Sequence, residues 1–445
     1  MCDIQKYRYD AGDTEGWLKI RKSLADRVGG SEIGAIAGHS PYRSAFASFC
    51  EKCGAVKAPV LKKREAIIQG HDGEQGVADR FEREMGLRVH KENSIMTNSK
   101  YPHLKASVDR LIYGRRSGLE CKTAQDMAMK KYKHGDFPMA YFDQCMLYLA
   151  VTGYVDWYLA IQVFGTSFRL FMMTLDKSKY ARYTELKDKF AEWEMFKAEN
   201  YLEWTYDHSQ KRFVWEGDVD SVDEAPELLL PEGLVNLLDD PDLTEWEDNR
   251  WGKLEAMYLV DQEELDACEQ VASLFIGRVE QVKAFMAGQE FEGEAERMAA
   301  LSSAVRQVWP ADELDGSAAT ADAVRAVTGT VAPDSVDVFD ESSELHQLVA
   351  ERAEIAARIK ELESDESQLD AKIEMSMGDL ETAKLAKWKV TYKMGAARET
   401  ASASAIKAYF ASKGAEVPAG ILSLSTPKRS LRFWEVKEKA PRKSK

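Results

Sequence analysis

Apolar and polar residues alternate along two short segments on either side of a cluster of turn residues. Residues 104–113 and 119–123 are rich in apolar side chains, and residues 114–118 between them include two glycines. Segments of this kind around a glycine-containing turn are typical of a β-hairpin. Because side chains alternate between the faces of a strand, Glu120 and Lys122 should share one face of the second strand.

The rest of the N-terminal half alternates between strand and helix patterns. Two further strands are predicted at residues 155–164 and 167–174, around Gly165. Apolar side chains three and four residues apart predict a series of helices. Four of these helices are expected near residues 14–21, 45–53, 73–85 and 180–193, and the second of them should end at Gly54. Two more should begin at Ser31, as the N-cap, and at Pro138. This order predicts an α/β fold, a mixed sheet flanked by helices.

In the C-terminal half the pattern changes to apolar side chains that repeat at alternating steps of three and four. Such heptads favour coiled-coil helices, either as an antiparallel hairpin within one chain or as pairs between subunits, and the sequence leaves both open. A poorly ordered middle, residues 299–343, is expected between them. Two short strands are predicted near the end, at 387–393 and 430–436. The heptad positions are Leu265, Cys268, Ala272, Phe275, Val279, Val282 and Met286, then Leu345, Leu348, Ile355, Ile359, Leu362, Leu369, Ile373 and Leu380.

The net charge of -15 is concentrated in one segment. Residues 216–248 hold thirteen Asp and Glu and no Lys or Arg, which leaves a net charge of about -2 for the rest of the chain. The acidity therefore does not exclude a local basic groove for nucleic acid. We expect this acidic segment to be a loosely ordered linker. The final 18 residues carry a net charge of +6, and they could either bind nucleic acid or form a solvated tail.

Composition also excludes two classes of protein. No apolar run approaches the roughly 18 residues of a membrane span, so we expect a soluble, cytoplasmic protein. Six cysteines in 445 residues are too few for a disulfide framework. Cys50 and Cys53 form a CxxC without a second pair to complete a four-ligand zinc or iron-sulfur site, so we interpret it as a coincidence.

The hairpin carries the strongest candidate chemistry. Asp109 on the first strand and Glu120 and Lys122 on the second should converge on one face. Carboxylates bind hard cations such as Mg²⁺, with Mn²⁺ as an alternative ion, and a nearby lysine can orient water or stabilise negative charge. This set suits metal-dependent phosphodiester cleavage. The alternative is a solvated hairpin face.

Two neighbouring helices offer further candidates for the same site. Glu74 lies on the apolar stripe of the helix at 73–85, where a buried carboxylate needs a partner such as a metal, although a solvated first-turn Glu is the alternative. Gln144 follows Pro138 on a helix side shared with Tyr141 and Tyr148, and can hydrogen-bond a phosphate, a water or a lysine.

Five residues are candidates for binding a phosphate group or the backbone of a nucleic acid. A helix N-terminus at Ser31 would present free N–H groups to an anion, and Arg21 could add a bidentate contact, whereas an ordinary capped helix is the alternative. The preceding glycine pair favours close approach of the backbone to a ligand. Arg27, Lys130 and Lys131 add positive charge that could meet the phosphate backbone.

Seven short motifs follow one another between about residues 10 and 175. They are Trp17-x-x-x-Arg21, Gly29-Gly30-Ser31-Glu32-Ile33-Gly34, Ser40-Pro41-Tyr42, Gly70-His71-Asp72-Gly73-Glu74, Ala106-Ser107-Val108-Asp109, Leu119-Glu120-Cys121-Lys122-Thr123 and Tyr141-x-x-Gln144-x-x-x-Tyr148 continuing to Gly153. Together they resemble the YqaJ-like viral recombinase family, relatives of the phage lambda exonuclease within the PD-(D/E)xK nuclease superfamily.

The resemblance implies a role for each matching residue. Asp109 and Glu120 would ligate Mg²⁺ with help from the Cys121 carbonyl, and Glu74 would lie in the same metal cluster. Lys122 would work with the attacking water, Gln144 would complete the site, and Arg21 and Ser31 match a 5′-phosphate pocket. The family often has Gly after Asp109. This chain has Arg110 there, which should point away from the metal if the strand alternation continues.

We therefore expect a Mg²⁺-dependent exonuclease that degrades linear duplex DNA, in the 5′ to 3′ direction by resemblance, and leaves single strands for phage-type recombination. Implied partners are DNA ends, a single-strand annealing protein and further copies of the chain, in the cytoplasm of a phage or prophage host. Alternatives are an endonuclease, a Cas4-like nuclease, or a DNA-binding coiled-coil scaffold without activity. The expected parts are a nuclease domain at 1–205, an acidic linker at 206–250, a coiled-coil region at 251–386, and a small β element with a basic tail at 387–445.

Overall fold

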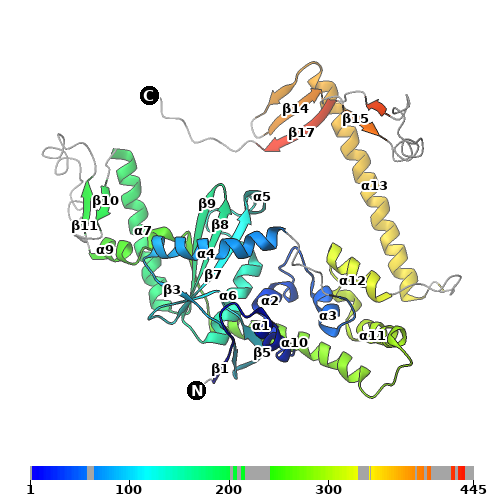
Figure 1. Cartoon of the computed structure of the whole chain (residues 1–445). Helices are drawn as coiled ribbons and strands as arrows, with labels where there is room; N and C mark the ends of the chain where they lie inside the picture. The colour runs from blue at the N-terminus through cyan, green and yellow to red at the C-terminus, as the bar shows by residue number, and fades with distance from the viewer. Residues whose placement is uncertain are drawn as a thin grey trace, which may run out of the picture. The chain divides into compact units, whose positions relative to one another are not determined.

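A computed structural model describes residues 3–57, 65–200, 204–207, 212–215, 241–328, 340, 342–385, 388–394, 398–401, 422–425 and 429–435. The chain divides into two compact units, Met1–Val331 and Ala332–Lys445 (Figure 1). Within the described residues, no helix is long and apolar enough to cross a membrane.

A six-stranded mixed sheet forms the centre of the first unit. Its strand order is β12-β9-β8-β7-β6-β3, in which β7 pairs parallel with β8, β12 pairs parallel with β9, and the other neighbours are antiparallel. This architecture confirms the predicted α/β class. The strands are β3 (Val89–Lys91), β6 (Arg110–Ile112), β7 (Ser117–Gln125), β8 (Asp156–Phe164), β9 (Ser167–Thr174) and β12 (Ala256–Leu259).

A second, four-stranded sheet has the order β1-β4-β5-β2. Its strands are β1 (Ile4–Arg8), β4 (Ser94–Asn98), β5 (Tyr101–Ala106) and β2 (Val28–Gly29). The predicted single strand at 104–113 is therefore wrong. It is split into β5 and β6, which belong to different sheets, and residues 107–109 join them. The predicted hairpin survives as β6 and β7, where Arg110 pairs with Leu119.

Helices cover both faces of the six-stranded sheet. The odd-numbered residues Trp157, Leu159 and Ile161 of β8 pack with α6 (Met139–Thr152), α10 (Gln262–Met286) and α3 (Ala45–Cys53). The even-numbered Tyr158 and Ala160 pack with α4 (Glu65–Met85), α7 (Lys177–Asn200) and α9 (Pro241–Asp248). This alternation buries both faces of β8, as expected for a strand in the middle of a sheet.

The apolar stripe of α10 is part of this core. Its residues Leu265, Phe275, Val279 and Val282 are at most 3% exposed and lie in the same cluster as residues of α6 and α3. The interpretation of this stripe as a coiled-coil seam is therefore wrong, since the core of the first unit already covers it. The expected disorder of residues 299–343 is also wrong for α11 (Glu294–Val308) and α12 (Ala318–Thr328), because the ring of Trp309 after α11 packs 4.9 Å from that of Phe49.

Part of the acidic segment is ordered. In α9 the side chains of Leu243 and Trp246 are buried, and Trp246 stacks on Tyr183 of α7 with ring centroids 5.6 Å apart. The apolar residues of α9 thus anchor the end of a segment that was expected to be loose throughout. A short hairpin precedes it, β10 (Trp204–Asp207) with β11 (Arg212–Trp215), and residues 216–240 lie outside the described part.

The second unit begins with the long helix α13 (Glu344–Met377). A three-stranded antiparallel sheet follows, β13 (Thr382–Lys384), β14 (Trp388–Met394) and β17 (Arg429–Glu435). These bounds confirm the two predicted terminal strands, which pair with each other. A further pair joins β15 (Arg398–Ala401) to β16 (Leu422–Ser425). Residues 436–445 of the basic tail lie outside the described residues.

Candidate active site

Strand β7 presents Glu120 and Lys122 on the face that α6 covers. The intervening Cys121 points the other way, into the apolar cluster that contains Phe81 of α4. Glu120 is 1% exposed and forms an ion pair with Lys122. The alternation predicted for this strand is therefore present, and it places a carboxylate and an ammonium group together within the core.

Gln144 of α6 connects the two charged groups. Its Nε2 donates to Glu120 Oε1 at 2.7 Å, and its Oε1 accepts from Lys122 Nζ at 2.9 Å. The same Nε2 also donates to Tyr148 Oη at 2.7 Å, and Tyr148 in turn donates to the backbone carbonyl of Ser107 at 3.0 Å. The network therefore links α6, β7 and the connection between β5 and β6.

Asp109 ends that connection and faces the same site. Its Oδ2 accepts the backbone N–H of Cys121 at 2.9 Å, which fixes the carboxylate against β7. Burial raises the pKa of Asp109, the positive charge of Lys122 lowers it, and the negative charge of Glu74 raises it again, with a net rise. The four predicted residues Asp109, Glu120, Lys122 and Gln144 are thus brought together.

Glu120 has the features of a metal ligand. Its Oε1 accepts two hydrogen bonds, whereas its buried Oε2 has no hydrogen-bond partner. Burial, and then the charge of Asp109, raise the pKa of Glu120 to about 8. Two buried carboxylates that repel each other, with an unpartnered oxygen, suit a divalent cation bound by oxygen ligands. The residues present therefore fit the implied metal.

Lys122 is held in its charged form by the same pair. Burial opposes the charge, but the carboxylates of Glu120 and Asp109 outweigh it and raise the pKa of Lys122. Its Nζ also lies 5.2 Å from the centre of the Tyr141 ring. A lysine fixed in this way can act as a positive charge or a hydrogen-bond donor, but not as a base at neutral pH.

Arg110 lies against Glu74, contrary to the expectation that it points away from the site. The two side chains form an ion pair, and Arg110 also donates to the carbonyl of Asp109 at 2.8 Å and to Gln75 Oε1 at 3.1 Å. The expectation fails because the bend at 107–109 breaks the strand alternation on which it rested. Glu74 is thus partnered by Arg110, and the described residues contain no group of three or more His, Cys, Asp and Glu arranged to hold a metal ion.

The predicted phosphate-binding residues divide into those near this network and those with other contacts. Helix α1 (Thr14–Ser23) places the Arg21 guanidinium 5.1 Å from the Trp17 ring, and Trp17 Nε1 donates to Ser107 Oγ at 3.4 Å. Arg21 is therefore connected to the site through Trp17 and Ser107. The N-cap of α1 is Asp13, which accepts the N–H of Gly16 at 2.9 Å.

Ser31 is exposed in the first turn of α2 (Gly30–Ile36), and the N-cap is Gly29 rather than Ser31. The side chain of Glu32, in the first turn of the helix, accepts the N–H of the N-cap residue Gly29 at 2.9 Å. Gly30 serves the packing of α2 against α6. A Cβ on Gly30 would lie 2.7 Å from the Tyr148 ring, so only Gly lets α2 approach α6 at this point.

The other three basic candidates have local partners. Arg27 donates to the carbonyl of Pro102 at 2.6 Å, and Lys130 forms an ion pair of 2.8 Å with Asp126. Lys131 lies over the ring of Tyr132 at 5.0 Å. None of these contacts involves the Asp109, Glu120 and Lys122 network, so the structure does not bring these residues to it.

Lys105, a buried lysine near Arg21, was not among the residues predicted from the sequence. Lys105 is 6% exposed and donates to the Leu24 carbonyl at 2.7 Å. Burial lowers its pKa to about 8, and the charge of Glu32 only partly compensates. Lys52 approaches Glu32 to 3.5 Å, so Lys105, Lys52 and Arg21 surround a single carboxylate. A lone lysine inside an apolar strand was the signal that could have indicated it.

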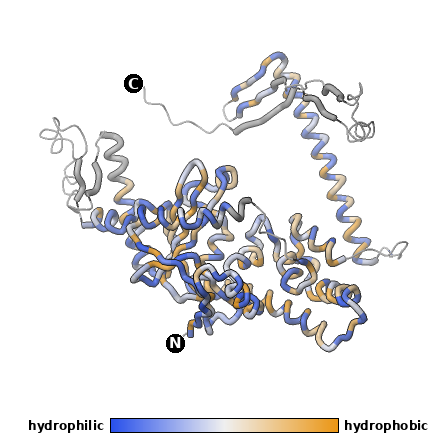
Figure 2. The backbone as a smooth tube through the Cα atoms, in the orientation of Figure 1, coloured by the Kyte–Doolittle hydropathy of each residue, from blue (hydrophilic) through white to orange (hydrophobic). Residues whose placement is uncertain are grey.

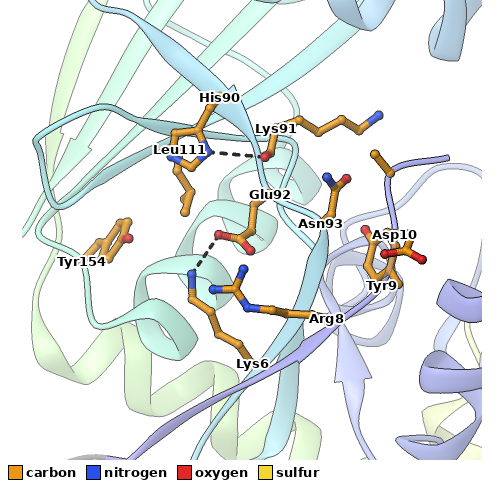
Figure 3. A pocket seen from close by; sticks show the side chains of 11 residues that line it. Lys6, Arg8, Tyr9, Asp10, His90, Lys91, Glu92, Asn93, Leu111 and Tyr154 are labelled. Carbon is orange, nitrogen blue, oxygen red and sulfur yellow. Dashed lines mark hydrogen bonds and ion pairs between the residues drawn. The ribbon is translucent and has the colours of Figure 1, made fainter. Parts of the chain in front are cut away.

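A polar cavity of about 690 Å³ is lined by residues of β1, β3, the loop before β4, and β6 (Figure 3). Lys6, Arg8 and Lys91 contribute positive charge to its lining, and Glu92 pairs with Lys6 at 2.8 Å. Burial, and the charges of Glu92 and Glu74, raise the pKa of Tyr9 in the lining of this cavity, although Ser107 acts in the opposite direction. The sequence analysis did not identify this cavity, because β1 and the loop before β4 meet only in the folded chain.

Comparison with known proteins supports one family. Residues 16–155 match the family model of the YqaJ-like viral recombinase domain. Over 155 residues the chain is 33% identical to the uncharacterized protein YqaJ of Bacillus subtilis (strain 168), and the match covers 34% of this chain and 47% of that protein. The chain therefore spans about half the length of this curated relative. These matches confirm the resemblance that the motifs indicated.

Two crystal structures of an alkaline exonuclease from Laribacter hongkongensis, one of them in complex with dAMP, are also similar. The TM-score is 0.30 for both, with sequence identities of 18% and 19%. The similarity covers 41% and 42% of this chain and 93% and 97% of those chains. At this TM-score the likeness carries no argument about function.

Proposed function

We propose that this protein is a metal-dependent deoxyribonuclease of the PD-(D/E)xK type that digests linear duplex DNA from its ends. One observation carries the proposal: the buried pair Asp109 and Glu120, with an unpartnered Glu120 oxygen, lies beside a charged Lys122 held by Gln144. The family match over residues 16–155 includes all four residues and adds support.

Each residue has a role in this proposal. Asp109 and Glu120 hold Mg²⁺, or Mn²⁺ as a substitute, and the Cys121 carbonyl and Glu74 complete the set of oxygen ligands. When bound, the cation polarises the scissile phosphate and lowers the pKa of water. Lys122 orients the attacking water and stabilises negative charge that develops on the phosphate. Gln144 holds the side chains of Lys122 and Glu120 in place through its hydrogen bonds to both.

We further propose that Arg21, Ser31 and the nearby positive charges of Lys52 and Lys105 receive the 5′-phosphate of a DNA end. Arg21 is suited to this because a guanidinium binds phosphate in a bidentate manner. Recognition of the 5′ end supports a 5′ to 3′ direction. Arg27, Lys130 and Lys131 would act at a distance from the reaction, as sequence-independent contacts to the DNA backbone.

The wider context is also a proposal. The family supports a cytoplasmic recombination enzyme of phage or prophage origin that assembles as a homo-oligomer and passes its single strands to an annealing protein. A Cas4-like enzyme is less well supported. Cys50 and Cys53 are free, burial raises the pKa of each thiol to about 12, and no other cysteine among the described residues joins them in a cluster.

The deciding experiment is a time course with Mg²⁺ on a linear duplex that carries a different label at each end of one strand, beside a covalently closed circle. Early release of the 5′ label with an intact circle is expected. Nicking of the circle would instead indicate an endonuclease. Absence of cleavage with both Mg²⁺ and Mn²⁺ would leave a DNA-binding scaffold.

A further inference from the structure

Helix α13 carries an apolar stripe that the described residues of its own unit leave exposed. Six of its Leu and Ile side chains remain between 49% and 59% exposed, whereas the corresponding stripe of α10 is buried. Figure 2 shows apolar residues recurring along this helix between hydrophilic ones. The six are Leu345, Leu348, Ile355, Ile359, Leu362 and Leu369. A regular stripe of this length on a helix of about 50 Å suits a second helix of equal length.

We propose that α13 pairs with α13 of a second copy of this chain as an antiparallel two-stranded coiled coil. The heptad positions named a and d fall on Leu345 and Leu348 and repeat every seven residues. Two of the a positions hold charges instead of apolar side chains, Arg352 and Glu366. Polar residues at a positions commonly select the orientation and register of a coiled coil at some cost in stability.

These two charges oppose a parallel pair. In a parallel, in-register pair, each a residue meets its own copy, so Arg352 would face Arg352 and Glu366 would face Glu366. In a symmetric antiparallel pair centred between Ile359 and Leu362, Arg352 lies level with Leu369 of the second copy. Glu366 of that copy is then only three residues away along the axis, about 4.5 Å, within reach of an arginine side chain.

The flanking g positions support the same orientation. They hold Glu351, Arg358, Asp365 and Lys372, so the charge alternates along the edge of the stripe. In the antiparallel register Glu351 meets Lys372 of the second copy and Arg358 meets Asp365, and the two-fold axis repeats both pairs. All four contacts join opposite charges. In a parallel pair, g residues meet e residues of the next heptad, so the attraction of Arg358 for Glu363 would be offset by the repulsion between Asp365 and Asp370.

The orientation can be tested on the full-length protein with single cysteines and a short bis-maleimide reagent. Leu345→Cys and Ser376→Cys are made separately, and the two proteins are also produced together. The antiparallel pair places position 345 beside position 376 of the second copy, whereas identical positions lie about 46 Å apart. We expect cross-linked dimers only in the co-produced sample, with the unmodified protein as the control for its native cysteines.

A charge reversal gives an independent test. Asp365→Arg should weaken α13-mediated dimers about tenfold in sedimentation equilibrium, because two symmetry-related attractions become repulsions. Arg358→Glu added to it should restore the affinity. In a parallel pair Asp365→Arg would instead strengthen association with Asp370. The control is Glu361→Arg, the same change in charge on the outer face of the helix, which should leave association unchanged.

Two outcomes would overturn the proposal. Cross-linking of Ser376→Cys with itself would indicate a parallel pair. Absence of cross-links in the co-produced sample would mean that something other than a second copy covers the stripe. DNA digestion by the same samples is measured separately, so the loss of the helix pair and the loss of nuclease activity remain distinguishable.

Discussion

The guanidinium of Arg110 forms an ion pair with the carboxylate of Glu74, and it also donates a hydrogen bond to the carbonyl of Asp109. A side-chain cation thus neutralises a carboxylate that the proposed function assigns to the metal. Because Arg110 holds Oε1 of Glu74 and cancels the negative charge of this carboxylate, the ion pair should weaken the binding of a divalent ion by Glu74.

Arg110→Met should therefore tighten binding of Mn²⁺, roughly tenfold, because an additional carboxylate becomes available. Isothermal titration calorimetry without DNA measures this directly. The double variant Glu74→Gln, Arg110→Met is the matched control and should return the affinity to that of the unmodified protein. If Arg110→Met alone leaves the affinity unchanged, Glu74 is not a ligand.

Lys122→Ala should abolish cleavage while metal and DNA binding persist. Lys122 contributes a positive charge next to Glu120 and a hydrogen bond to Gln144, and the variant removes both from the site. We expect a loss of about 100-fold or more in the rate of digestion. Gel-shift assays with Ca²⁺ check that DNA is still bound. A fully active variant would remove Lys122 from the mechanism.

The sequence predicted the placement of the side chains on β7 better than that of the side chains on the segment that leads into β6. Glu120 and Lys122 lie two residues apart on one regular strand, so simple alternation placed them together. The same rule failed between Ser107 and Arg110, where Tyr148 and Cys121 bond to the connecting segment and the chain passes from one sheet to another. Long-range contacts decide such a bend, and they are not visible in local periodicity.

Heptads alone also did not distinguish a core helix from an exposed one. The stripes of α10 and α13 have similar spacing, but only α10 is covered by the first unit. Burial depends on which elements the topology brings alongside. The cavity beside Tyr9 illustrates the same limit, because its lining comes from β1, the loop before β4, and β6.

Arg21→Ala should selectively slow the digestion of 5′-phosphorylated ends. Arg21 is the basic residue of α1 that stacks on Trp17, and through it contacts Ser107 beside Asp109. The rate on 5′-phosphate ends should fall by about tenfold or more, with little change on 5′-hydroxyl ends. Lys22→Ala, the neighbouring exposed residue of the same helix, is the control. Equal slowing on both ends would contradict the phosphate pocket.

Arg8→Ala and Lys91→Ala should each weaken binding of duplex DNA. Both side chains line the polar cavity that also contains Tyr9, and we expect them to contact DNA phosphates. Each change should reduce the slope of log affinity against log salt by about one, uniformly across DNA sequences. Lys283→Ala, an exposed lysine of α10, is the control. An unchanged salt dependence in both variants would place the DNA elsewhere.

Lys105 should make stability depend on pH in the alkaline range. Its folded-state pKa is lowered from 10.5 to about 8, so between these values the unfolded chain holds more protons than the folded one. The free energy of unfolding should therefore rise with pH through this window, by up to about 3 kcal/mol. Urea unfolding of the unmodified protein and of Lys105→Met, at about pH 7 and about pH 10, measures the effect as a difference, with Lys283→Met as a control for the loss of a lysine. If the two proteins change in parallel, Lys105 is not held in a desolvated, positively charged environment, and its contribution to the proposed phosphate pocket would have to be abandoned.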